Sequence, residues 1–206
     1  MDEVNRALTR ASILRASLGV FKDSGYQDAS LGEIARRADV PLENLLEIFP
    51  DKEELYNQAC RSAVESWHNW FVEKSRMESD ALASFIALCR EAFFFLARHD
   101  ETRGFLQTGP LVFAFSSERF NDITDRGVAF LAAKLRECAE AGIFRAMDYE
   151  RVAVTMHEIF KLLILTTYTQ PHDKRSEDLF ENVLDLFLHG LFEREAPARS
   201  PGTEQR

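Results

Sequence analysis

Apolar residues recur at intervals of three and four along almost the whole chain, which is the spacing of a helix with one buried face. The first segment is typical, because its apolar positions are Val4, Leu8, Ala11, Leu14, Leu18 and Phe21. The sustained alternation of a half-buried strand does not occur anywhere in the sequence. We therefore predict an all-α fold without a sheet.

Turn and capping residues divide the first fifty residues into three short helices. Gly25 suits the left-handed residue that follows a helix, so the first helix should end at residues 23–25. Residues 30–33 fit a capping box, in which the Ser30 hydroxyl accepts from the N–H of Glu33 and the Glu33 carboxylate reaches back. The second helix should stop near Asp39. The third should start near Pro41 and end at residues 49–51.

Longer helices are expected after residue 51, and some of them are apolar on more than one face, as in helices buried between several neighbours. We expect them at 52–76, 80–99, 101–115 (disturbed by Gly109-Pro110), 117–141, 148–170 and 175–194. The tail from Ala196 is polar and rich in Pro and Gly, so we expect it to be disordered. The predicted organisation is a head at 1–50, a larger helical domain at 51–195 and a tail at 196–206.

The composition is that of a globular protein that can bury a core, with 46% hydrophobic and 29% charged residues. No segment approaches the length of a membrane span, and the N-terminus lacks the features of an export signal, so we expect no membrane association. The three cysteines are widely spaced, which is typical of reduced thiols in a cytoplasm. The net charge of −9 argues mildly against a purely electrostatic nucleic-acid binder. Residues 1–60 alone hold seven Lys or Arg against eleven Asp or Glu.

Motifs for catalysis, cofactor binding and metal binding are missing from the sequence. It has no glycine-rich phosphate loop, no Cys-x-x-Cys and no His-Glu-x-x-His. His68 follows Glu65 on one predicted helix, and His157 precedes Glu158, but such pairs are common on helix surfaces. We expect no enzyme activity, no cofactor and no metal.

Residues 13–55 resemble the DNA-binding domain of the TetR family of bacterial transcriptional regulators. The matching residues keep the spacing of the family and are Ile13-Leu14, Ala16, Leu18, Phe21, Gly25-Tyr26, Ser30, Ile34-Ala35, Ala38, Val40, Leu45, Phe49, Lys52-Glu53 and Leu55. The all-helical remainder also looks like the ligand-binding and dimerising domain of that family. Within it, AGIFRAMDYERVA resembles the turn that precedes the dimer helices.

This resemblance implies the family's architecture and function. The second and third helices would form a helix-turn-helix whose third helix enters the major groove of a palindromic operator. Two subunits would join through their last two helices to form a homodimer. A small molecule bound in the larger domain would change the spacing of the two heads and release DNA, as expected for a ligand-responsive repressor in the cytoplasm.

The positions that would touch DNA depart from the family. Ala29 stands where a Thr is usual, and Asp39 stands where a Gly is usual. Residues 41–44 replace a run of small and polar residues, while Leu46 and Ile48 replace an aromatic pair. The resemblance places the DNA contacts at Arg10, Ser30, Arg36, Arg37, Pro41, Leu42, Glu43, Asn44, Leu46 and Lys52, with Arg6 as a further candidate.

The third helix is acidic on its polar face, where Glu43 and Glu47 would repel phosphates. Glutamate can accept a hydrogen bond from cytosine N4, but attraction must then come from the arginines and Lys52. Leu42 and Leu46 widen the apolar stripe toward the surface that would meet DNA. An alternative hypothesis is therefore a family member with weakened or lost DNA binding. Such a protein would act through a protein partner or as a small-molecule sensor.

The larger domain is rich in aromatic residues, and the family uses this domain to bind small molecules. An aromatic stripe at helical spacing is more often core than pocket. We predict a pocket for an apolar or aromatic molecule lined by Trp67, Trp70, Phe71, Phe93, Phe113, Met156 and Phe160, with His157 or Arg90 as a polar contact. A histidine on an apolar helix, such as His157, is more often a satisfied core or dimer-interface residue than a ligand contact.

Overall fold

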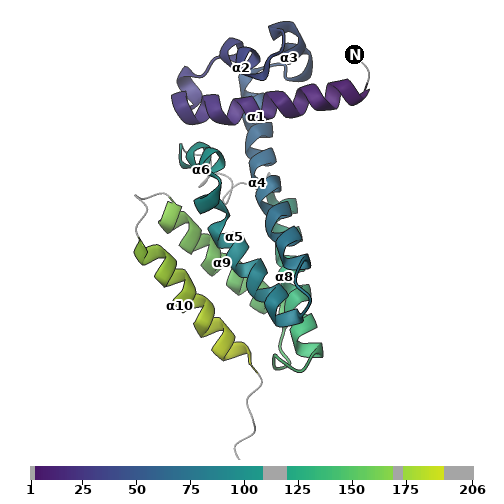
Figure 1. Ribbon diagram of the computed structural model, residues 1–206, viewed down its shortest axis with the longest axis vertical. Helices are drawn as coiled ribbons and strands as arrows, with labels where there is room; N and C mark the ends of the chain where they lie inside the picture. Colours follow the sequence, from purple (N-terminus) through teal and green to yellow (C-terminus); the bar gives the residue numbers. More distant parts are fainter. Residues whose placement is uncertain (1–2, 109–119, 169–173, 193–206) are drawn as a thin grey trace, which may run out of the picture.

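The computed structural model describes residues 3–108, 120–168 and 174–192, and in these ranges it is built from α-helices (Figure 1). The helices are α1 (Glu3–Asp28), α2 (Leu31–Ala38), α3 (Leu42–Ile48), α4 (Lys52–Arg76), α5 (Ala81–Arg98), α6 (Asp100–Gln107), α8 (Asn121–Glu140), α9 (Tyr149–Tyr168) and α10 (Lys174–Leu191). The described ranges contain no strand, only an isolated bridge between Phe144 and Phe192. The all-α prediction is confirmed. The expectations for Gly109-Pro110, Phe113 and the tail from Ala196 lie outside the described residues.

Helices α1, α2 and α3 form a head in which the predicted turns hold. Gly25 has φ 70° inside α1 and marks the kink where its regular part ends. The Ser30 hydroxyl accepts from the N–H of Glu33 at 3.1 Å and caps α2. Asp39, with φ 57°, closes α2 in the left-handed conformation. The head packs around Ile13, Phe21, Ile34, Leu45 and Phe49, all of them buried.

The start of α1 differs from the prediction. Val4 and Leu8 were expected on the buried face, yet they are 71% and 66% exposed. Figure 1 shows the first turns of α1 extending beyond α2 and α3, so no helix of the head covers them. The start of α1 is helical, as predicted, but no neighbouring helix within the described chain buries the apolar face that contains Val4 and Leu8.

Helix α4 is 25 residues long. It joins the head to the larger helical domain, which is called the body below. The Asp51 side chain caps it by accepting from the N–H of Glu54 at 2.8 Å. Helices α5, α8 and α9 pack with its lower part into one bundle, and α10 lies on the outside against α9 (Figure 1). The rings of Phe93 and Phe180 stack at 4.2 Å between α5 and α10.

The short helix α6 also touches the head, because it packs against α1 (Figure 1). The aliphatic part of Lys22 crosses Gly104 so closely that a Cβ there would lie 2.6 Å from Lys22 Cε. On the next turn of α1, Gly19 faces the side chains of Glu101 and Arg37. The head therefore contacts the body through two helices, α4 and α6.

Candidate nucleic-acid interface and ligand cavity

Helix α3 lies at the end of the molecule, where it is fixed from below by two apolar side chains. Leu45 and Phe49 are buried in the head, as predicted. Leu42, Glu43, Leu46 and Glu47 are exposed on the other side of the helix, and Asn44 is half-buried. The candidate contact surface of α3 is therefore apolar in the middle and acidic at its flanks.

The two arginines of α2 are exposed but are held by carboxylates. Glu33 accepts from Arg36 Nη2 at 2.8 Å and from Arg37 Nε at 2.9 Å. Arg37 Nη1 also donates to Asp23 Oδ2 at 2.9 Å. The hydrogen bonds from these two arginines lower the pKa of Glu33 to about 2. The prediction that Glu33 reaches back to the start of α2 is wrong, because its carboxylate is turned toward the arginines.

Two further cations expected at the DNA surface also have partners, in the head or on α4. Arg10 Nη2 donates to Gln58 Oε1 at 2.9 Å, and its guanidinium lies 5.6 Å from the centre of the Phe49 ring. Lys52 Nζ donates to the carbonyls of Gln27 and Ala29 at 3.0 and 3.1 Å. Lys52 thus ties the start of α4 to the loop that precedes α2.

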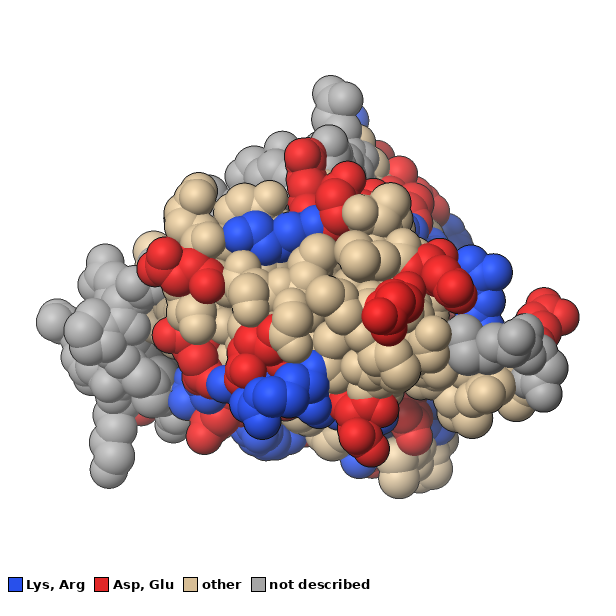
Figure 2. All heavy atoms as spheres, turned by 90° about the horizontal axis from the view of Figure 1, so that it is seen from above, with Lys and Arg blue, Asp and Glu red and all other residues tan. Residues whose placement is uncertain are grey.

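Seen from above, the end face of the head carries both signs of charge (Figure 2). Blue and red side chains are interleaved over the described part of this face, with tan surface between them. The face is neither a basic strip nor uniformly negative. Ser30 and Pro41 are exposed in this region. All ten predicted contact residues lie in or directly beside the head.

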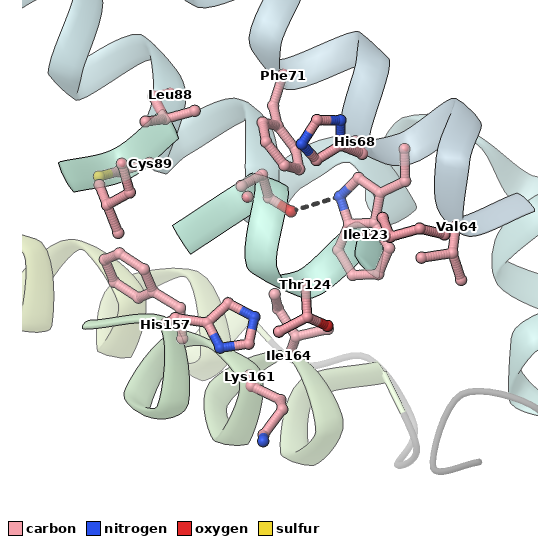
Figure 3. Close-up of a pocket in the computed structure, with 15 residues that line it drawn as sticks. Val64, His68, Phe71, Leu88, Cys89, Ile123, Thr124, His157, Lys161 and Ile164 are labelled. Atoms are coloured by element: carbon pink, nitrogen blue, oxygen red, sulfur yellow. Dashed lines mark hydrogen bonds between the residues drawn. The ribbon is translucent and has the colours of Figure 1, made fainter. Parts of the chain in front are cut away.

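The body contains a partly open cavity of about 120 Å³ lined by α4, α5, α8 and α9 (Figure 3). Its walls are mainly apolar and aromatic, with a few polar groups. They consist of Val64, Trp67, His68, Phe71, Leu88, Cys89, Ala92, Ile123, Thr124, Gly127, Leu131, His157, Phe160, Lys161 and Ile164.

The structure brings four of the nine predicted pocket residues to this cavity: Trp67, Phe71, His157 and Phe160. The remaining described ones point elsewhere. Phe93 and Met156 are buried away from the cavity lining. Trp70 donates to Glu91 at 2.9 Å, and Arg90 to Glu181 at 2.8 Å. Phe113 lies outside the described residues.

His68 is a polar cavity residue that the sequence prediction missed. It shares a helix face with Val64 and Phe71, and this spacing of four and then three residues was the signal that could have placed it. Its Nε2 atom is buried and has no hydrogen-bond partner within the described residues. Arg61 on the same helix pairs with Glu65 and with Asp122, and the pair with Asp122 joins α4 to α8.

Burial governs the ionisation of the groups around the cavity. It lowers the pKa of both His68 and His157, so both rings are neutral near pH 7. Burial also raises the pKa of the Cys89 thiol. All three cysteines are buried and free, which leaves them as inert core residues.

Two searches of the described residues bear on other kinds of site. No group of His, Cys, Asp and Glu in them could hold a metal ion. None of their helices combines the length and the apolar character that crossing a membrane requires.

Comparison with known proteins adds to this geometry. The family model described as "Bacterial regulatory proteins, tetR family" matches residues 13–59. The same region is 38% identical over 58 residues to the HTH-type transcriptional regulator RutR of Escherichia coli K12. That alignment covers 28% of this chain and 27% of RutR, so the chain matches only about a quarter of this relative's length.

Solved structures resemble the chain over nearly its full length. A TetR-family transcriptional regulator from Pectobacterium atrosepticum has a TM-score of 0.78 at 17% identity, over 95% of this chain and all of that one. A TetR transcriptional regulator from Streptomyces coelicolor is 26% identical, with a TM-score of 0.59 over 90% of this chain and 99% of that one. A Saccharomonospora viridis protein solved with choline has a TM-score of 0.72 at 18% identity, over 90% and 98% of the two chains.

The fold and the head together define a class of protein, a helix-turn-helix domain carried on an all-helical body. The head matches the TetR family of bacterial regulatory proteins, and the whole chain shares the fold of solved TetR-family regulators.

Proposed function

We propose that this protein is a dimeric transcriptional regulator that represses by binding a palindromic operator through its two heads. A small, mainly apolar molecule in the body cavity would act as the effector that releases DNA. The observation that carries this proposal is the helix-turn-helix at the end of the molecule, with α3 exposed, in the segment that matches the family model.

Exposed apolar side chains on α9 and α10 support a dimer through these two helices. Leu162 on α9 is 62% exposed and Leu186 on α10 is 72% exposed. Val154 and Leu179 are exposed on the same two helices. Helix faces of this kind are usually covered in an oligomer.

The mixed charge of the head bears on the alternative hypothesis of weakened or lost DNA binding. Arg36, Arg37 and Lys52 have partners inside the head, and Glu43 and Glu47 are exposed. The comparisons give no support to that alternative, and surface arginines can exchange a carboxylate for a phosphate at modest cost. We therefore retain DNA binding as the proposed function.

The test is a fluorescence titration of the purified protein with the DNA upstream of its own coding sequence, over a series of salt concentrations. The logarithm of affinity should fall linearly with the logarithm of salt, with a slope of roughly −0.9 for each phosphate contacted. Absence of binding at low salt would end the proposal.

Two head variants and one control locate the surface. Glu43→Gln should strengthen nonspecific binding because it removes repulsion from phosphates, whereas Lys52→Ala should weaken binding. Glu140→Gln removes an exposed carboxylate at the end of α8, in the body, and should change nothing. If Glu43→Gln abolishes binding at one sequence only, Glu43 contacts a base there.

A further inference from the structure

The cavity wall includes a fully buried side-chain nitrogen without a hydrogen-bond partner among the described residues. His68 Nε2 is buried and lacks a partner among the described residues. Buried polar side-chain atoms are nearly always paired, because an unpaired one loses its contact with water and gains nothing in return. His68 is part of the cavity wall (Figure 3), so a turn of its ring toward the cavity would let a ligand there supply the missing partner.

The size and walls of the cavity limit the rest of the ligand. Its volume of about 120 Å³ is close to the roughly 150 Å³ of an engineered apolar cavity that binds benzene. Trp67, Phe71 and Phe160 supply aromatic surface, and Leu88 and Ile164 supply aliphatic surface. This space fits a single ring with small substituents.

The charges around the cavity favour a ligand without charge. Lys161 is the one cationic side chain in the described lining, and its Nζ atom lies 2.5 Å from Glu158 Oε2, so its charge is already neutralised. Burial keeps the rings of His68 and His157 neutral by lowering the pKa of each. A carboxylate or ammonium group would lose its hydration here without gaining an opposite charge.

We propose that the cavity binds an uncharged, single-ring organic molecule that carries a hydroxyl group, and that this hydroxyl pairs with His68 Nε2. A hydroxyl both donates and accepts, so it can pair with Nε2 whichever ring nitrogen carries the proton. An ether or a hydrocarbon of the same size lacks one or both of these capacities. The inference rests on the proposed function only in treating this molecule as the effector.

The experiment is calorimetry of the full chain, without DNA, using three probes that share a methyl-substituted ring: 4-methylphenol, toluene and 4-methylbenzoate. The wild-type protein should bind 4-methylphenol roughly tenfold more tightly than toluene, which is the gain from one neutral hydrogen bond. It should bind 4-methylbenzoate more weakly than either. Equal binding of 4-methylphenol and toluene, or no saturable binding of any probe, overturns the inference.

Two variants assign the preference to His68. In His68→Leu the preference for 4-methylphenol over toluene should disappear, because the apolar side chain leaves no partner for the hydroxyl. His189→Leu is the matched control, since His189 is exposed on α10, and it should keep the preference. If His68→Leu keeps the preference as well, the hydroxyl is recognised elsewhere and the inference is wrong.

A third variant tests the location. A Cβ added at Gly127 would lie 3.6 Å from His68 Cδ2, in ordinary contact, so Gly127→Leu should fold while its side chain takes up cavity space. All binding should be lost in this variant, and retained binding would place the probes outside the cavity. These results are separate from the DNA titration, so loss of DNA binding with intact probe preference would reject the regulator but not the ligand class.

Discussion

Asp39 gives the sharpest test of how the head is built. It has φ 57° and ψ 45°, a conformation that costs most residues roughly 1–2 kcal/mol and that Asp and Asn tolerate best after Gly. Its N–H donates to carbonyls at the end of α2, and this backbone bond does not depend on the side chain. Substitutions at Asp39 should therefore change stability through backbone conformation alone.

We expect Asp39→Ala to lower the free energy of unfolding by about 1 kcal/mol, because alanine has no polar side chain to stabilise the left-handed conformation. Asp39→Gly removes the Cβ and should be neutral or slightly stabilising. Asp39→Asn should be neutral. For a chain of this size, a loss of about 1 kcal/mol corresponds to a fall in Tm of roughly 2–4 °C.

The measurement is urea unfolding at pH 7, with the same slope against urea required for all variants. Glu43→Ala, an exposed change on the neighbouring helix, is the control and should stay within about 0.5 kcal/mol of the wild type. If Asp39→Ala is as stable as the wild type, or if Asp39→Gly is the least stable of the three Asp39 variants, the left-handed conformation does not set the stability at this position.

Three further predictions concern the core, the dimer and pH. Leu45→Ala empties a fully buried site under α3 and should cost about 2–5 kcal/mol in urea unfolding, with loss of DNA binding. Leu162→Glu should convert dimer to monomer in analytical ultracentrifugation, whereas Met77→Glu, equally exposed at the end of α4, should not. The pKa of His68 is lowered below 6.5 by burial, so the unfolded chain binds this proton first and stability falls as pH drops through 6.5. Between pH 7 and 5.5 the Tm of His68→Leu should therefore fall less than the Tm of the wild type. An equal fall would contradict burial of His68 as the cause of the pH dependence.

The head could be predicted from sequence because its boundaries are set by local signals. Ser30 caps α2, Asp39 ends it and Pro41 precedes α3, and each acts on residues within one turn of itself. The pairing of Arg37 with Asp23 was not predictable in this way, because it joins residues fourteen positions apart on different helices. Helical spacing alone also could not show that no helix in the described part of the chain covers Val4 and Leu8.

The cavity was only partly predictable for a similar reason. Helical spacing identifies which residues of a helix face inward, but it does not tell which neighbour they meet. Phe93 is buried as expected, yet it meets Phe180 of α10 and not the cavity. Gly127 and Thr124 line the cavity although neither is large or aromatic, because α8 packs against α4 and supplies part of the wall.

Helix α4 has a mechanical consequence, because one unbroken helix carries both Lys52 at the head and His68 at the cavity. The sixteen residue steps from Lys52 to His68 span about 24 Å, so a tilt of about 5° near the cavity would carry the far end through roughly 2 Å. In a symmetric pair of chains the two displacements add. A molecule no larger than one ring could thus alter the separation of two distant recognition helices by an amount comparable to the length of a hydrogen bond.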